Sequence, residues 1–99
     1  METFKEIING DQPVLVDFFA TWCGPCKVMT PIVESLGKEL KGQARILKID
    51  LDKNRTLADQ LSVQSVPTFI IFKKGEIVWR TSGVTDKNTL VQQIQYFVE

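Results

Sequence analysis

The sequence predicts an α/β domain built on one mixed sheet with helices on both faces. Strand-like and helix-like segments alternate through the first half of the chain, which is typical of a parallel βαβ unit with a right-handed crossover. In the second half, two β-rich runs flank Lys74-Gly75, which predicts an antiparallel hairpin. Because the chain has 99 residues, we expect a single domain spanning positions 1–99.

The first two elements follow from a capping pattern and from hydrophobicity. Thr3 and Glu6 form a capping-box pattern, which predicts a short helix near the start of the chain. Residues 14–20 read VLVDFFA and are apolar on both faces apart from Asp17. Such a run indicates a strand buried at the centre of a sheet.

Helical periodicity marks the next segment. Apolar residues recur on one stripe between positions 28 and 40, which predicts a long helix. Pro31 lies inside this pattern and predicts a kink rather than a stop. A second strand is expected over 44–50, followed by a short helix that Asn54 can cap.

The second half of the chain completes the sheet. Residues 68–73 and 76–81 are the strands of the predicted hairpin, and apolar residues between 90 and 98 lie on one face of a final helix. The predicted order is therefore α-β-α-β-α-β-β-α, without an internal linker or repeat.

Composition excludes several classes of function. The 12 basic and 12 acidic residues give a formal net charge of zero, which argues against nucleic acid or an anionic membrane surface as a partner. The chain has no histidine, which excludes Cys-His and Ser-His catalysis within the chain. Its two cysteines are too few for a four-cysteine metal site, so we expect no metal.

The chain carries no pattern for export or membrane insertion. Its first residues, METFKE, are charged and lack the apolar core of a secretory leader. The longest apolar runs are far shorter than the roughly 18 residues that a membrane helix needs. We therefore expect the protein to stay where it is synthesised, in the cytoplasm.

Cys23 and Cys26 are the main candidates for chemistry, because they lie where a buried strand is expected to meet a helix. A purely structural disulfide is a poor interpretation, since so short a loop restricts the unfolded chain little. A metal site lacks further ligands. A Cys-x-x-Cys pattern beside a βαβ unit instead indicates a redox-active dithiol.

The positions of the two sulfurs predict different roles. The free N–H groups and the positive dipole end of a helix N-terminus favour a thiolate, which is the form that attacks disulfides. Cys23 lies nearest the strand-to-helix turn, so we expect it to be the exposed nucleophile. Cys26 lies one turn inside the helix and is expected to be the less accessible, resolving thiol. Gly24 is expected to let the backbone turn closely, and Pro25 suits the first helical turn.

The sequence WCGPCK at residues 22–27 resembles the active-site motif of the thioredoxin family. The Gly-Pro pair between the cysteines, without histidine, resembles the reducing members rather than glutaredoxins or disulfide isomerases. The segments that carry the resemblance cover nearly the whole chain: VDFFATWCGPC at 16–26, Pro31, KIDLDKN at 48–54, SVPTFIIFKKGE at 65–76, and Gly83. The resemblance implies a thioredoxin fold, an α/β fold with four helices and a mixed four-stranded sheet. The implied strand order is 44–50, 14–20, 68–73, 76–81.

Asp17 is the candidate proton carrier. A buried carboxylate is costly unless it is paired, so we expect the pKa of Asp17 to be raised; the alternative is a carboxylate satisfied by backbone donors. Cys26 must lose a proton before it attacks, and the chain has no histidine to take it. The resemblance implies that Asp17 exchanges protons with Cys26 and that a nearby Lys48 tunes Asp17. From the residues alone, Lys48 is more simply a solvated charge at a sheet edge.

The remaining candidates would form a substrate-binding surface. Trp22 beside the nucleophile indicates an aromatic docking surface, with a place in the core as the alternative. Pro67 alone indicates only the start of a strand, and Gly83 is equally consistent with a turn. The resemblance implies that the bond before Pro67 is cis, that the Val66 backbone pairs with an extended substrate, and that Pro67 blocks metal capture by the cysteines. The expected flat, largely apolar patch consists of Trp22, Gly24, Pro25, Val66 and Gly83.

Two features depart from the family pattern. Phe19 stands where many members have tryptophan, which is a conservative change. Only Met1-Glu2 precede Thr3, so the additional N-terminal strand of typical members is absent from the prediction. The strand at 44–50 then becomes a sheet edge with unpaired backbone groups. We expect a monomer, with a dimer through this edge as the alternative.

The expected function is that of a general thiol–disulfide oxidoreductase, working mainly as a protein disulfide reductase. It would cycle between a Cys23/Cys26 dithiol and a disulfide without a bound cofactor. By resemblance, a flavin-containing thioredoxin reductase that uses NADPH would regenerate the dithiol, and disulfide-containing proteins would be the substrates. Two alternatives stay open: an exported oxidase or isomerase, and a thioredoxin-like binding module that docks a partner without turnover.

Overall fold

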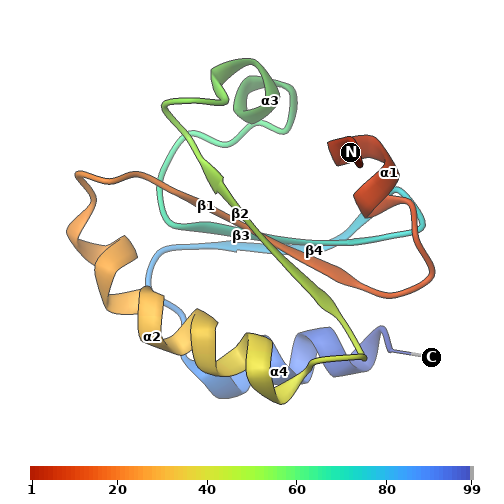
Figure 1. Ribbon diagram of the computed structural model, residues 1–99. Coiled ribbons are helices and arrows are strands. Elements are labelled where there is room, and N and C mark those ends of the chain that lie inside the picture. Colours follow the sequence, from red (N-terminus) through yellow and green to blue (C-terminus); the bar gives the residue numbers. More distant parts are fainter. Residues whose placement is uncertain (99) are drawn as a thin grey trace.

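The computed structural model describes residues 1–98, in which helices and strands alternate along the chain (Figure 1). The elements are α1 (Phe4–Ile8), β1 (Val14–Phe19), α2 (Gly24–Glu39), β2 (Arg45–Asp50), α3 (Arg55–Gln60), β3 (Thr68–Lys73), β4 (Glu76–Ser82) and α4 (Lys87–Tyr96). This order is the predicted one. Pro31 does not end α2, which continues through it as one helix.

Within the described residues, the sheet has four strands in the predicted order β2-β1-β3-β4. β1 and β2 are parallel, which places Asp17 opposite Lys48. β3 is antiparallel to both β1 and β4, so the sheet is mixed. Residues 14–18 of β1 are all buried, which confirms the central position that its apolar sequence predicts.

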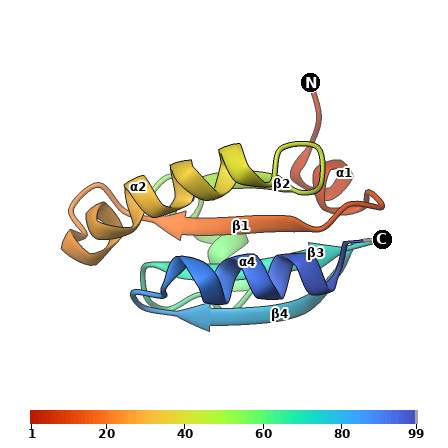
Figure 2. The same ribbon diagram turned by 90° about the horizontal axis from the view of Figure 1, so that it is seen from below.

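The helices cover the two faces of the sheet in pairs. α2 and α4 lie on one face, and α1 and α3 lie on the other (Figures 1 and 2). Because side chains alternate along a strand, Leu15 of β1 packs with the core under α2 and α4, whereas Val16 and Phe18 pack with the core under α1 and α3. The same alternation turns Asp17 toward the face that carries α2.

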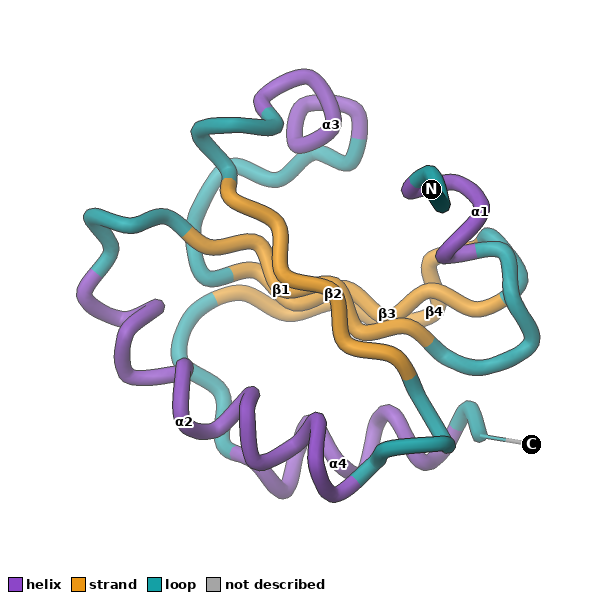
Figure 3. The backbone as a smooth tube through the Cα atoms, viewed as in Figure 1, coloured by secondary structure: helices purple, strands orange, loops and turns teal. Residues whose placement is uncertain are grey.

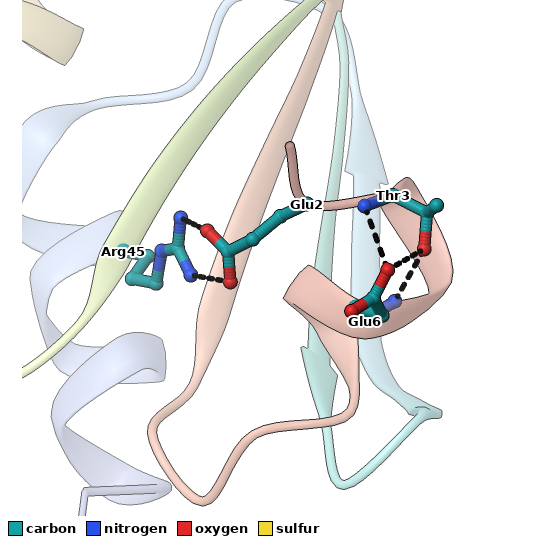
Figure 4. A network of polar contacts seen from close by, with 4 residues as sticks. All are labelled: Glu2, Thr3, Glu6 and Arg45. Atoms are coloured by element: carbon teal, nitrogen blue, oxygen red, sulfur yellow. Dashed lines mark hydrogen bonds and ion pairs between the residues drawn. The ribbon is translucent and has the colours of Figure 1, made fainter.

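Local capping explains where the short helices begin. The capping box of α1 is confirmed: the Thr3 hydroxyl accepts from the Glu6 N–H, and the Glu6 carboxylate accepts from the Thr3 N–H (Figure 4). Asn54 lies at the N-cap position of α3, but its side chain makes no capping hydrogen bond. The prediction that Asn54 caps α3 through its side chain is therefore wrong; the side-chain Nδ2 instead donates to the Asp50 carbonyl at 3.0 Å.

The predicted hairpin between β3 and β4 is confirmed, and its turn has the conformation that the sequence requires (Figure 3). Lys74 and Gly75 both have positive φ, at 53° and 83°. Two such residues in succession give the tight turn that matches the twist of the two strands. The pairing is irregular between Ile71 and Phe72, where the register shifts.

β2 lies at the edge of the sheet as predicted, since β1 is its only strand neighbour within residues 1–98. Glu2 lies against the start of this edge: its carboxylate accepts from the Arg45 guanidinium at 2.9 and 3.2 Å (Figure 4). This contact lowers the pKa of Glu2. Because both side chains are exposed, the pair adds little to stability.

Candidate active site

The turn after β1 brings Cys23 and Cys26 together at the start of α2. Cys23 is the N-cap residue, with an extended backbone, and Cys26 lies in the first turn. Their sulfurs form a disulfide, and their Cα atoms are 5.3 Å apart. The spacing of three residues is what allows this, because residues three apart lie on the same face of a helix.

The Cys23 sulfur takes the place of a capping oxygen. The Cys26 N–H donates to Cys23 Sγ at 3.1 Å, which is the contact that a serine or aspartate N-cap normally makes. The first turn of α2 contains no acidic residue. A thiolate at Cys23 would accept the same N–H and would face the positive end of the helix dipole. The local structure therefore favours negative charge on this sulfur.

Both cysteines are enclosed in the disulfide state. Cys23 is 4% exposed and Cys26 is 7% exposed, so the prediction that Cys23 is the exposed one is wrong for this state. Phe19 and Val66 pack against the cluster that contains both cysteines, and Cys23 Sγ lies 3.6 Å from the Val66 carbonyl oxygen. Cys23 is covered because a loop more than forty residues later in the chain lies against it.

The Gly24-Pro25 pair shapes the surface beside Cys23. We expected Gly24 to let the backbone turn closely, but Gly24 is not among the residues with positive φ, and a Cβ added there would meet no atom within 4 Å. The open space around Gly24 shows instead that glycine keeps the surface low, because no side chain projects there. Pro25 lies in the first turn of α2 as predicted, where its missing N–H costs no helical hydrogen bond.

The loop before β3 supplies the other wall around Cys23. The Val66–Pro67 peptide bond is cis, and Val66 packs against the cysteine cluster. Gly83, at the end of β4, donates its N–H to the Pro67 carbonyl at 2.8 Å. Its φ of +89° explains why glycine occupies this position. The fold thus places Val66 against Cys23 and Gly83 against Pro67.

Trp22 belongs to the surface rather than to the core, since 65% of it is exposed. Its Nε1–H donates to Asp52 Oδ2 at 2.7 Å, and Asp52 Oδ1 accepts from Arg55 at 2.7 Å. Asp52 therefore fixes the polar edge of the indole. Sequence reasoning missed this role, although Asp52 lies two residues after the end of β2 and the carboxyl ends of the parallel β1 and β2 meet at one edge of the sheet.

Asp17 is buried without full hydrogen bonding. It is 4% exposed, and its Oδ1 has no hydrogen-bond partner, so backbone donors do not satisfy the carboxylate. Burial raises the pKa of Asp17 to about 6, and the positive charge of Lys48 partly opposes this rise. The group therefore titrates close to neutral pH, where it can accept and return a proton.

A cleft joins Asp17 to the second cysteine. It has a volume of about 240 Å³, and Asp17, Lys48 and Cys26 all line it. Lys48 Nζ lies 5.0 Å from the centroid of the Phe19 ring, so the ammonium faces an aromatic surface at the rim of this cleft. Space of this size between polar groups admits water, which can carry a proton between the carboxylate and the thiol.

Two further findings concern the described part of the chain. Within residues 1–98, no three His, Cys, Asp or Glu side chains gather so that they could hold a metal ion. Over the same residues, no helix is both long enough and apolar enough to cross a bilayer.

The chain is similar to proteins of one family over most of its length. The family model described as Thioredoxin matches residues 1–96. A thioredoxin-like protein of Synechocystis sp. is 49% identical over 96 residues, which are 96% of this chain and 91% of the relative. The thioredoxin of Rickettsia felis is 44% identical over 90 residues, which are 91% of this chain and 86% of that protein.

Solved structures of thioredoxins also have the same fold as this chain. A mutant thioredoxin from Halobacterium salinarum has a TM-score of 0.87 at 37% sequence identity, and the match covers 96% of this chain and 82% of that one. The thioredoxin of Fasciola hepatica has a TM-score of 0.83 at 39% identity, over 90% of this chain and 84% of that one. With its paired cysteines at the start of α2, the chain belongs to the thioredoxin family of thiol–disulfide oxidoreductases.

Proposed function

We propose that the protein is a general protein disulfide reductase. The observation that carries this proposal is the asymmetry of the two sulfurs. Cys23 Sγ accepts the Cys26 N–H at the start of α2, whereas Cys26 shares a cleft with a carboxylate that titrates near pH 6. One sulfur is therefore suited to carry negative charge, and the other has a proton acceptor nearby.

In the first step, the Cys23 thiolate attacks one sulfur of a substrate disulfide. The substrate S–S bond breaks, a bond forms between Cys23 and that sulfur, and the second substrate sulfur leaves as a thiolate that takes up a proton. The helix N-terminus supports this step because it stabilises the attacking thiolate before the reaction.

In the second step, Cys26 resolves the mixed disulfide. Cys26 loses its proton to Asp17 through the cleft and attacks Cys23 Sγ, so the mixed disulfide breaks and the Cys23–Cys26 disulfide forms. The substrate sulfur released from Cys23 leaves as a thiolate and takes up a proton, so the substrate departs as a dithiol with two more electrons and the protein is left oxidised. Lys48 limits the rise in the pKa of Asp17, which keeps the carboxylate available as a base near neutral pH.

Substrates dock on the Cys23 side of the disulfide. An extended segment pairs with the Val66 main chain, as a strand adds to an edge, and the exposed face of Trp22 supplies apolar contact. At Gly24 and Gly83 no side chain projects from the surface around Cys23, whereas a Cβ at either position would point into open space. In this proposal Pro67 covers the sulfurs and limits metal capture by the reduced cysteines.

Regeneration completes the cycle. A flavin-containing thioredoxin reductase returns two electrons from NADPH to the Cys23–Cys26 disulfide, and the chain itself binds no cofactor. We place this cycle in the cytoplasm, with the protein acting as a monomer on disulfide-containing proteins.

The direct test is insulin reduction coupled to NADPH oxidation by a thioredoxin reductase. We expect catalytic reduction that disappears in a Cys23→Ser variant. No reduction of insulin by the wild-type protein would contradict the proposal. A redox titration against glutathione separates the reductase from an exported oxidase or isomerase, which would hold its disulfide at a markedly more oxidising potential. Full biological activity of a Cys23→Ser, Cys26→Ser double variant would favour a binding module instead.

A further inference from the structure

The loop that carries Val66 is held at both of its ends by β4. It runs from the end of α3 to the start of β3 (Figure 1), and its Val66 packs against the cluster that contains both cysteines. At its first end, the side chain of Arg80 binds the loop. At its second end, Ser82 and Gly83 do so. These two attachments are built from different groups and can be tested separately.

The first end of the loop leaves α3 through a left-handed residue. The Ser62 N–H donates to the Asp59 carbonyl at 3.1 Å, and the Val63 N–H donates to the Ala58 carbonyl at 2.8 Å. This pair of bonds is the Schellman pattern, which places a residue of positive φ just after the helix, normally a glycine. Here Ser62 occupies that place with a φ of +56°, a conformation that a side chain disfavours. Further contacts to the carbonyls of this turn would offset the cost of that conformation.

Arg80 supplies those contacts. It lies on β4 opposite Ile70, whose side chain packs in the core beneath α1 and α3. From there its Nη1 donates to the Leu61 carbonyl at 2.8 Å, and its Nη2 donates to the Ser62 carbonyl at 3.3 Å. Carbonyls at a helix C-terminus are the preferred partners of a cation, and the planar guanidinium can meet two of them at once.

The second end of the loop is fixed by short contacts next to Pro67. The Thr68 hydroxyl donates to the Ser65 carbonyl at 2.7 Å and lies 3.0 Å from the Ser82 hydroxyl. The Gly83 N–H binds the Pro67 carbonyl, as described above. With the second end fixed beside the disulfide, the Arg80 contacts at Leu61 and Ser62 fix the first end of the segment that carries Val66.

We propose that Arg80 is a positioning residue for extended peptide substrates. By holding the Leu61 and Ser62 carbonyls, it sets the path of the loop and presents the Val66 main chain to a substrate strand. This inference rests on the proposed function, in which Val66 pairs with substrate. Arg80 does not touch the sulfurs, so its loss should weaken peptide docking much more than it slows the exchange of sulfur bonds.

The test compares two substrates of the reduced protein. Insulin offers a peptide main chain beside its disulfide, whereas lipoamide is a small cyclic disulfide without one. For Arg80→Met, which removes the donors but keeps much of the side-chain length, we expect the KM for insulin to rise about fivefold with kcat changed less than twofold. This fold-change is what the loss of one or two charge-assisted hydrogen bonds produces when only part of their energy is coupled to binding. The rate with lipoamide should fall by a much smaller factor.

Matched variants make the result specific. Arg80→Lys keeps the charge and can still reach one carbonyl, so the KM for insulin should recover in part. Arg45→Met removes an arginine that contacts Glu2 at the opposite edge of the sheet and should leave both substrates unaffected. Equal losses on insulin and lipoamide, or an unchanged KM for insulin, would overturn the positioning role.

A second variant guards against simple unfolding. If thermal melting shows that Arg80→Met is poorly folded, an added Ser62→Gly change relieves the left-handed strain without restoring a donor. We expect the double variant to regain its melting temperature while the KM for insulin stays high. A KM that returns to the wild-type value with the melting temperature would overturn the proposal. Failure of the wild-type protein to reduce either substrate would instead overturn the proposed function.

Discussion

The two sides of the Cys23–Cys26 disulfide are built from different groups. The Cys23 side is formed by main-chain and apolar surfaces, including the exposed Trp22 and the Val66 carbonyl 3.6 Å from the sulfur. The Cys26 side opens on a cleft lined by three ionisable groups, Asp17, Lys27 and Lys48. In the proposed mechanism, this difference separates substrate recognition from proton transfer across a single disulfide. Substitutions on the Cys23 side should therefore change substrate binding, and substitutions on the Cys26 side should change resolution of the mixed disulfide.

The largest effect is expected when one of the two cysteines is replaced by serine. A Cys26→Ser variant keeps the attacking thiolate but has no resolving thiol, so turnover of insulin should stop and a mixed disulfide should accumulate at Cys23. Intact-mass spectrometry, followed by peptide mapping, detects the adduct and its position. The control is Cys23→Ser, which should form no such adduct. A stable adduct on Cys26 in that control would show that the two roles are reversed.

The second prediction concerns the buried carboxylate and the stability of the oxidised protein. Because burial raises the pKa of Asp17 from 3.8 to about 6, the folded protein binds more protons than the unfolded chain between these values. Stability contributed by this group is therefore highest below pH 3.8 and is lost as the pH rises through about 6. The shift corresponds to about 3 kcal/mol at neutral pH.

An Asp17→Asn variant removes this titration. In urea unfolding, the variant should be more stable than the wild type at pH 7 by up to about 3 kcal/mol, and the difference should disappear toward pH 3. Asp11→Asn, at the other end of the sheet and exposed, is the matched control and should show no such pH dependence. A difference that is constant with pH would mean that Asp17 does not carry the buried charge.

A smaller effect is expected on the docking side. Trp22→Ala removes the exposed aromatic face and should raise the KM for insulin about tenfold with little change in kcat. Asp52→Leu removes the acceptor that holds the indole at 2.7 Å and should raise the KM roughly threefold, since the ring remains but loses its fixed orientation. Steady-state kinetics measures both. A loss confined to kcat would place Trp22 in the chemical step instead.

Most of the fold could be predicted from the sequence, because its signals are local. The alternation of helix and strand patterns, the apolar strand at 14–20 and the turn at Lys74-Gly75 each act over a few residues, and the structure confirms them. The burial expected for Asp17 was local too, since apolar neighbours surround it on the same strand. The raised pKa then follows from burial alone.

The parts that could not be predicted depend on contacts between distant segments. The spacing of Cys23 and Cys26 fixes their place on α2 but gives no sign that Val66 covers Cys23. Asp52 lies in the segment KIDLDKN, which carries part of the family resemblance. Its contact with Trp22 nevertheless appears only when the ends of β1 and β2 lie side by side. Asn54 lies at the N-cap position of α3, but its side chain donates to the Asp50 carbonyl and makes no capping hydrogen bond.

The separation of substrate recognition from proton transfer is tested most directly by measuring attack by Cys23 and resolution by Cys26 in separate experiments. In a Cys26→Ser background, the rate of mixed-disulfide formation with insulin reports attack by Cys23 alone. With both cysteines present, turnover requires resolution as well.

We predict that Asp17→Asn leaves the rate of mixed-disulfide formation unchanged and lowers turnover at pH 7 by on the order of 100-fold, as expected for a lost general base. The wild-type turnover should rise with pH through about 6, and this inflection should be absent in Asp17→Asn. An Asp17→Asn variant that slows attack as much as turnover would contradict the separation.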